Sequence, residues 1–250
     1  MTSVSNALQI LDLLGEGISL RVVDVAHKLG VANSTAHRLL STLRDNGYLR
    51  QQEGSSRYEA GPAALRLARR VNTERALERI ALPHLQALRR DVNETVNLQV
   101  LVGNEVLFIA SVEAHHQLRV ALRVGTRGAA YANAGGKLLL AQLTDDEVRA
   151  RLGEKLEGLA PHTIVKMDEL LKNLSDIRHK GYALNTGETN EGVRAVAVGI
   201  PGSDGTVIAA LSLAAPATRL SIGRVRVFLP YLKATALAIF DDYRGSTVYL

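Results

Sequence analysis

The sequence predicts an α+β fold in two parts, a small helical unit with a β-hairpin followed by a larger unit built on an antiparallel sheet. Two observations support this prediction. Residues 1–60 carry apolar positions at helical spacing and then two short β-rich runs, whereas the residues after Glu94 alternate β-rich runs with separate helical stretches. The 250 residues, 46% hydrophobic and 22% charged, are typical of a globular protein and leave room for two domains.

Three short helices are expected before residue 48. The first spans about Ser5 to Gly15, and the second ends at Gly30, because glycine tolerates the left-handed conformation of a helix C-cap. The third begins near Asn33 or Ser34, either of which could cap it. Apolar stripes at i, i+3, i+4 and i+7 spacing mark the buried faces: Val22, Val25, Ala26 and Leu29 in the second helix, and Ala36, Leu39, Leu40 and Leu43 in the third. Two strands, 48–52 and 57–60, follow around a turn.

The stretch from Gly61 to Asp91 has a helical composition. Pro62 suits a first helical turn, and we expect Pro83 to break or restart the helix. The net charge of +5 comes from residues 61–90, which hold seven Arg against Glu74 and Glu78. This basic stretch either faces phosphate or is a solvated helix face.

The second part should be a sheet with helices around it. Strands are expected at 96–103 and 105–113, joined by a turn at Gly103-Asn104, then at 117–125, and finally at 193–200 and 207–214 around the turn 202–205. Helices are expected at 133–142, 144–152, 167–180 and about 219–241.

The third helix suggests what the first part does. With its apolar stripe facing inward, its outer face carries Ser34, Arg38 and Ser41, flanked by Thr35, His37, Thr42 and Arg44. A reader of the DNA major groove needs this set, because Arg recognises guanine edges and Ser or Thr bonds phosphates or bases. The hairpin would then be a wing that brings Arg57 near the DNA backbone. A merely solvated helix face and a winged helix that docks protein are the alternatives.

We find no pattern of an enzyme, cofactor or metal site. The chain has no cysteine, and His115-His116 lack further ligands. Gly135-Gly136-Lys137 matches only half of a phosphate loop; it is better interpreted as a glycine-lined helix start whose N–H groups suit a carboxylate. Asp145, Asp146 and Glu147 look like the charges of a helix N-terminus. With no apolar run of membrane-spanning length and no secretory signal, a cytoplasmic location is expected.

Five segments together resemble the IclR family of transcription regulators. Residues 22–61 resemble its winged helix-turn-helix, through the "LG-V" turn, Ser34-Thr35, the run His37 to Leu40 and Gly47-Tyr48. Residues 93–98 (NETVNL) resemble the family's "GETVNL", and residues 132–141 (ANAGGKLLLA) resemble "ATAxGKAxLA". Residues 181–183 and 187–193 resemble its "GYA" and "GV" segments. The resemblance covers nearly the whole chain.

The resemblance implies a winged helix-turn-helix at 1–61, a linker helix at 62–74, and a GAF-like effector and oligomerisation domain at 75–250. It implies binding to double-stranded, usually palindromic operators as a homodimer or homotetramer, with Leu65, Ala68 and Val71 as candidates for part of the dimer contact, unless they pack on their own domain. It also implies an effector pocket, whose candidate residues here are Ala134, Gly135, Asn185, Ala195, Ala197 and Ser212.

Three departures from the family pattern bear on the ligand. Ala195 stands where the family often has Cys or Ser, Asn185 where it often has Asp, and Gly199 where it often has Pro. We therefore expect a more apolar cavity and, as effector, an aromatic or apolar-bodied carboxylic acid or amide. The alternatives are a small-molecule enzyme that uses its winged helix for docking, and an architectural DNA binder with no ligand.

Overall fold

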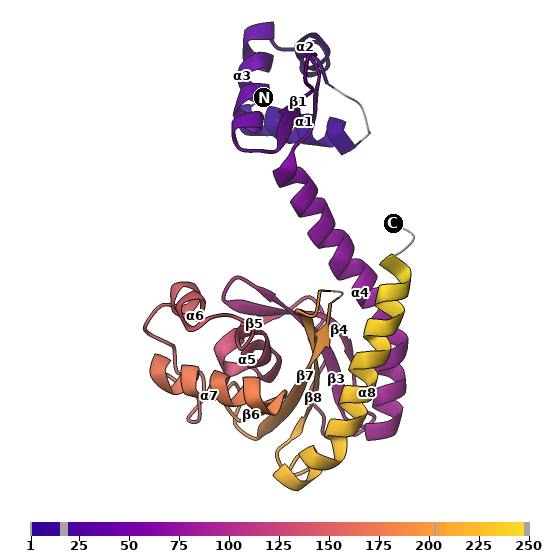
Figure 1. Ribbon diagram of the computed structural model, residues 1–250, viewed down its shortest axis with the longest axis vertical. Coiled ribbons are helices and arrows are strands. Elements are labelled where there is room, and N and C mark those ends of the chain that lie inside the picture. The colour runs from indigo at the N-terminus through magenta and orange to yellow at the C-terminus, as the bar shows by residue number, and fades with distance from the viewer. Residues whose placement is uncertain (1, 16–19, 203, 248–250) are drawn as a thin grey trace. The chain divides into compact units, whose positions relative to one another are not determined.

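Two units, Met1–Arg75 and Ala76–Leu250, make up the chain, and the computed structural model describes residues 2–15, 20–202 and 204–247 (Figure 1). The first unit holds three helices and a two-stranded hairpin, and the second a six-stranded sheet with helices. The predicted α+β fold class is confirmed.

The N-terminal unit is a winged helix-turn-helix. Its elements are α1 (Ser3–Gly15), α2 (Val22–Leu29), α3 (Asn33–Asp45), β1 (Leu49–Gln51) and β2 (Tyr58–Ala60). The two strands are antiparallel, with Arg50 opposite Glu59. The apolar stripes predicted for α2 and α3 meet Ile10, Leu20, Leu49 and Tyr58 in one core. This core fixes which face of α3 points to solvent.

The turn between α2 and α3 depends on Gly30, which has a φ of 63° and donates its N–H to the carbonyls of the last turn of α2. A residue with a Cβ adopts this conformation only at a cost. The predicted cap of α3 is wrong. The N-cap is Ala32, and no side chain caps the helix, because Asn33 and Ser34 already lie inside its first turn.

The helix α4 (Pro62–Val92) is continuous, so the predicted break at Pro83 is also wrong. Pro83 is exposed, and its ring removes one backbone hydrogen bond within the helix. The neighbouring turns hold the helix in place, because Leu77, Ala81, Leu85 and Leu88 are buried against the sheet of the second unit. The boundary between the two units falls within α4.

The second unit is built on an antiparallel sheet with the strand order β5-β4-β3-β8-β7-β6. The strands are β3 (Thr95–Val102), β4 (Glu105–Val112), β5 (Arg127–Ala129), β6 (Ala183–Thr186), β7 (Val193–Pro201) and β8 (Val207–Pro216). The predicted turn at Gly103 is present, with a φ of 64°. In the other predicted turn, 202–205, Ser203 lies outside the described residues.

Helices cover both faces of this sheet (Figure 1). The C-terminal part of α4 and α8 (Ile222–Thr247) pack on one face. The 3-10 turn η1 (Ala130–Ala132), α5 (Ala134–Leu140), α6 (Asp145–Leu152) and α7 (Met167–Lys180) cover the other. Along β8, Leu211 and Leu213 face the α4–α8 layer, whereas Ala210 belongs to the core under α5. Ser212 and Ala214 line a cavity on that second side.

Two further predictions differ from the structure. Residues 117–125 form turns and irregular backbone in place of a strand, and Leu118, Leu122 and Val124 are exposed. A run of alternating apolar residues forms a strand only where a neighbouring strand is free to make backbone hydrogen bonds with it. The edge of β4 is already paired with β5, so it offers no such partner to residues 117–125. The strand β6 was not predicted. The last helix begins and ends later than 219–241.

Candidate functional site

The outer face of α3 carries hydrogen-bonding side chains. Ser34, His37 and Arg38 are exposed, and Thr35 and Ser41 are half-buried on the same side of the helix. These positions follow the three- and four-residue spacing of one helical face, opposite Ala36, Leu39 and Leu40 in the core. A helix of this kind can enter the major groove with short donors and one long cation directed at base edges.

Three other predicted DNA-contact residues already have partners within the protein. The Thr42 hydroxyl donates to the Arg38 carbonyl at 2.9 Å, and Arg44 Nη2 lies 2.9 Å from Asp45 Oδ1. Both pairs are exposed, so DNA could replace these partners at little cost. Arg57 also interacts within the protein and is half-buried immediately before β2, the second strand of the wing.

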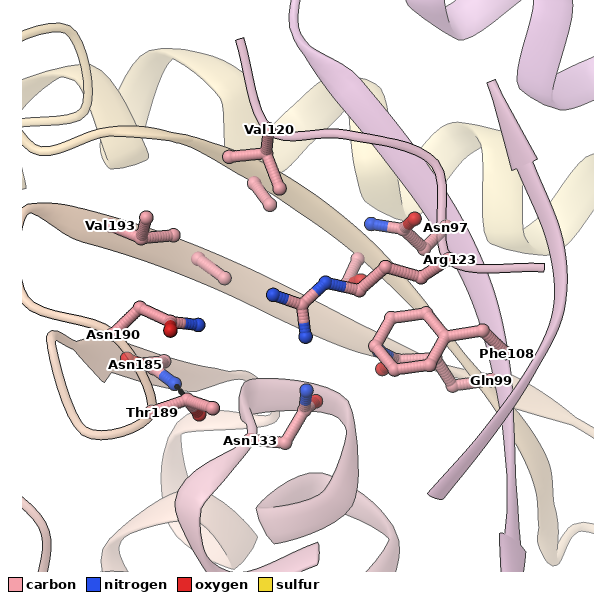
Figure 2. Close-up of a pocket in the computed structure, with 13 residues that line it drawn as sticks. Asn97, Gln99, Phe108, Val120, Arg123, Asn133, Asn185, Thr189, Asn190 and Val193 are labelled. Atoms are coloured by element: carbon pink, nitrogen blue, oxygen red, sulfur yellow. Dashed lines mark hydrogen bonds between the residues drawn. The ribbon is translucent and has the colours of Figure 1, made fainter. Parts of the chain in front are cut away.

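The second unit contains a cavity between the sheet and the start of α5, with a volume of about 40 Å³ (Figure 2). Apolar atoms supply more of its lining surface, although eight of the lining residues are polar: Asn97, Gln99, Arg123, Asn133, Asn185, Thr189, Asn190 and Ser212. The apolar part consists of Phe108, Val120, Val193, Ala195 and Ala214. The expectation of an apolar cavity with few polar groups therefore holds only in part.

The sheet contributes buried polar residues to the cavity. Asn97 and Gln99 on β3 and Ser212 on β8 have at most 2% of their surface exposed. Neighbouring residues of these strands face the opposite core, so strand alternation directs the three polar side chains to the α5 side. Asn97 Oδ1 accepts a hydrogen bond from the Ser111 hydroxyl at 2.7 Å. Gln99 Oε1 is buried and has no hydrogen-bond partner among the described residues.

Asn133 and two glycines shape the start of α5. Asn133 Oδ1 accepts from the N–H groups of Gly135 and Gly136 at 3.0 and 3.3 Å. The free N–H groups expected here for a carboxylate are therefore occupied by an N-cap. A Cβ at Gly135 would collide with Gln99 Oε1, and one at Gly136 with the Ala130 carbonyl. Close packing, not phosphate binding, accounts for both glycines.

The loop after β6 is fixed to η1. Asn185 donates through Nδ2 to the Ala132 carbonyl at 2.6 Å, and its Oδ1 accepts from the N–H groups of Gly187 and Glu188. Thr189 donates to the same Ala132 carbonyl at 2.5 Å. These bonds position Thr189 and Asn190 at the cavity wall and use most of the bonding capacity of the Asn185 side chain.

A buried ion pair supports the same loop. Lys137 Nζ lies 2.6 Å from the Glu188 carboxylate, and the two side chains are 1% and 6% exposed. Burial lowers the pKa of Lys137, and the charge of Glu188 opposes this shift. The Thr163 hydroxyl donates to the Glu188 carbonyl at 2.6 Å. Lys137 thus links α5 to the loop, in place of the phosphate contact that its sequence motif partly resembles.

Comparison with known proteins decides the family. Residues 70–240 match the family model described as "Bacterial transcriptional regulator IclR C-terminal", and residues 3–53 match the "IclR helix-turn-helix domain". The chain belongs to the IclR family. It is therefore a DNA-binding transcriptional regulator, as the sequence resemblance implied.

IclR-family relatives match along almost the whole chain. The HTH-type transcriptional regulators XynR and KdgR of Escherichia coli (strain K12) are 33% and 30% identical to it, over 95% and 97% of this chain and 95% of each relative. The crystal structure of the Thermotoga maritima IclR has a TM-score of 0.64 at 26% identity and covers 96% of this chain and 98% of that one. An IclR homolog from Microbacterium hydrocarbonoxydans, complexed with 4-hydroxybenzoate, has a TM-score of 0.64 at 26% identity and covers 98% and 100%.

Of the six residues chosen as effector contacts from the IclR resemblance, Asn185, Ala195 and Ser212 line the cavity. Ala134, Gly135 and Ala197 are not among its lining residues, although Gly135 contacts Gln99 from behind the wall. Sequence reasoning missed Gln99, Arg123 and Asn133, among others. Asn97 and Gln99 alternate with apolar residues along β3, a pattern that ordinarily marks the solvent-facing side of an antiparallel strand, so their burial could not be predicted from the sequence.

Within 2–15, 20–202 and 204–247, no group of three or more His, Asp or Glu side chains could hold a metal ion. No helix in these ranges combines the length and the apolar character that a membrane span requires.

Proposed function

We propose that this IclR-family regulator changes its affinity for operator DNA when a small organic molecule occupies the cavity of its second unit. The observation that carries the proposal is the cavity itself, which sets unused polar groups beside an apolar wall in the unit that is not needed for the DNA-binding fold. A ligand alters DNA binding only if it binds two states of the protein with different affinities.

On the DNA side, we propose contacts from Ser34, Thr35, His37 and Arg38 to the major groove, supported by Ser41, Thr42 and Arg44, with Arg57 on the wing near the backbone. One winged helix gives limited affinity, so we expect a homodimer or homotetramer that reads two half-sites of a palindromic operator. The exposed Leu65 on α4 is a candidate for part of the dimer contact. The side chain of Val71, the other large apolar candidate, lies outside the described residues.

On the ligand side, Asn185, Ala195 and Ser212 remain proposed effector contacts, and Ala134, Gly135 and Ala197 form the packing directly behind them. Phe108, Val120 and Val193 supply an apolar wall for the body of the ligand. The Microbacterium homolog, crystallised with 4-hydroxybenzoate, supports an aromatic acid or amide as the class to test first. Binding of two-carbon oxoacids without binding of aromatic acids would contradict this class.

We propose no catalytic activity, because the relatives XynR and KdgR are transcriptional regulators. Turnover of a bound compound would support the alternative of an enzyme that uses its winged helix for docking.

The first experiment is binding of the purified protein to a labelled fragment of its own upstream region, with increasing salt and nonspecific competitor. We expect selective binding with a steep dependence on salt, because Arg and Lys side chains release counterions from phosphate. Adding 4-hydroxybenzoate, 4-hydroxybenzamide or glyoxylate should then change the operator affinity for at least one compound. Binding no better than to competitor DNA would contradict operator recognition in this region.

A further inference from the structure

No carboxylate of the described residues pairs with Arg123. Its neighbours in sequence, Arg119 and Arg127, pair with Glu113 and Glu105. Among the residues that the structure describes, the Arg123 guanidinium has no ion pair and no hydrogen bond; it only lies over the Phe108 ring, 5.7 Å from the centroid. In Figure 2 it points into the middle of the cavity, toward Asn133 and Asn190. A half-buried cation without an anion is unfavourable, so this position favours an anionic ligand.

Apart from Gln99 Oε1, a buried acceptor without a partner among the described residues, the remaining wall also suits an anion. The lining residues include no Asp and no Glu. Asn97 and Asn133 already use their Oδ1 atoms as acceptors, for the Ser111 hydroxyl and for the start of α5, which leaves their NH₂ groups as donors. Ser212 adds a hydroxyl from the floor of the cavity. One positive charge with several neutral donors matches one carboxylate, whereas a doubly charged phosphate would leave a negative charge buried without a partner.

The segment that carries Arg123 is fixed on both sides of it. Before Arg123, Thr95 donates through Oγ1 to the Val120 carbonyl at 2.7 Å, and Glu113 Oε1 accepts from the Leu122 N–H at 2.9 Å. After it, the Gly125 N–H donates to the Phe108 carbonyl at 2.8 Å. These bonds hold the backbone of Arg123 at the mouth of the cavity, while its side chain retains freedom to meet a ligand.

We propose that Arg123 recognises the charge of the effector, and that the effector is therefore a small carboxylic acid and not the corresponding amide. The inference rests on the proposed function and makes it more specific, because that function leaves acid and amide open. Arg123 is a specificity-determining residue, and the 113–126 segment is the part of the cavity wall that presents it.

The test compares matched acids and amides on the full-length protein. Benzoate is paired with benzamide, and pyruvate with pyruvamide, each titrated into wild type, Arg123→Gln, Arg123→Lys and the control Arg127→Gln by isothermal calorimetry. We expect at least one acid to bind wild type in preference to its amide. Arg123→Gln should weaken that acid about tenfold to hundredfold, because a hydrogen bond to a charged partner is lost. Arg123→Lys should retain part of the affinity, and Arg127→Gln should retain all of it.

Three outcomes would overturn the inference: an amide that binds as tightly as its acid, an Arg123→Gln variant that binds the acid like wild type, or no binding of any acid. Binding of inorganic phosphate without binding of any acid would also contradict the inference. Operator binding measured with the same compounds separates this from the proposed function. If a neutral compound changes the operator affinity, the proposed function stands and the proposed role of Arg123 is contradicted. If acids bind but leave the operator affinity unchanged, the role of Arg123 stands and regulation by these acids is contradicted.

Discussion

At the scale of single residues, Lys137 and Glu188 show how polar chemistry supports the cavity from behind. The sequence singled out Lys137 as part of an incomplete phosphate motif, and nothing in the sequence pairs it with a glutamate fifty-one positions later. Only the tertiary fold brings α5 against the loop after β6. The ion pair with Glu188 explains why the apolar helix α5 tolerates a buried lysine, because each charge neutralises the other.

This pair predicts a non-additive effect on stability. Lys137→Met leaves Glu188 buried without its partner and should lower the free energy of unfolding by about 3–5 kcal/mol, whereas Lys137→Met combined with Glu188→Leu should lower it much less. Urea denaturation of both variants measures the difference. The exposed pair of Lys166 and Glu169 is the matched control, and Lys166→Met should cost less than about 1 kcal/mol. Equal losses for the single and the double variant would contradict this account.

Glu113 predicts a pH dependence. The side-chain hydrogen bond from Arg119 and the backbone bond from Leu122 lower its pKa below the ordinary value of 4.5. A lowered carboxyl pKa means that the ionised form is bound more strongly in the folded state, so this contribution is present above the ordinary pKa and is lost as pH falls through the lowered one. The protection factor of the Leu122 amide, which corrects hydrogen exchange for its intrinsic pH dependence, should therefore fall in acid, and Glu113→Gln should show a low protection factor already at neutral pH. Exchange that is equally slow in the variant would argue against this role.

Arg38 predicts the effect of losing one base contact. Arg38→Ala should leave folding intact, because the side chain is exposed, and should reduce discrimination between operator and competitor DNA by about 1–3 kcal/mol. Arg226→Ala, which removes one exposed charge from the second unit, is the control. If Arg38→Ala discriminates like wild type, α3 does not read bases through this residue.

At the scale of elements, the sequence predicted helices and hairpins best where local signals decide. The turn at Gly103, the end of α2 at Gly30 and the span of α7 each follow from local sequence. The failures have a non-local cause. Burial of Leu85 and Leu88 keeps α4 continuous through Pro83. Residues 117–125 do not form a strand because β4 pairs with β5 and leaves them no strand to bond with. For the same reason the 113–126 segment, and with it Arg123, could not be assigned to the cavity from the sequence.

The helix predicted at 144–152 is confirmed as α6, and side chains cap its N-terminus. Thr144 accepts from the Glu147 N–H at 3.3 Å, and the Glu147 carboxylate accepts from the Thr144 N–H at 2.8 Å, which completes a capping box. Thr144→Ala should lower the free energy of unfolding by about 0.5–2 kcal/mol. Thermal denaturation with Thr218→Ala, an exposed threonine outside any helix, as control checks this. No difference between the two variants would show that the box contributes nothing to stability.

At the scale of the whole molecule, the chain combines a DNA-binding unit with a unit that contains a cavity, and α4 is the helix in which the boundary between them falls. Regulation requires that DNA and the effector each bind two states of one equilibrium with different affinities. The sequence pattern predicted both units, and the family resemblance predicted the cavity residues Asn185, Ala195 and Ser212. Most of the lining could not be predicted, because it comes from segments far apart in the chain.

Recognition of two half-sites predicts a dependence on their spacing. Once an operator is known, insertion of about 5 base pairs at its centre, half a helical turn, should abolish high-affinity binding, whereas insertion of about 10 should restore part of it. Gel-shift titrations measure both. An affinity that does not depend on the insertion would mean that each winged helix binds alone.

The hydrogen bonds of the cavity wall also bear on the use of such a regulator as a biosensor. Asn133, Asn185 and Thr189 hold α5, η1 and the loop after β6 together, and Gly135 leaves no room for a side chain beside Gln99. Libraries that alter these positions would mostly yield unfolded protein. Val120, Val193, Ala195 and Ala214 line the same cavity through apolar side chains that no polar bond ties down. Diversity confined to these four positions would retune the response to new inducers while the scaffold stays intact.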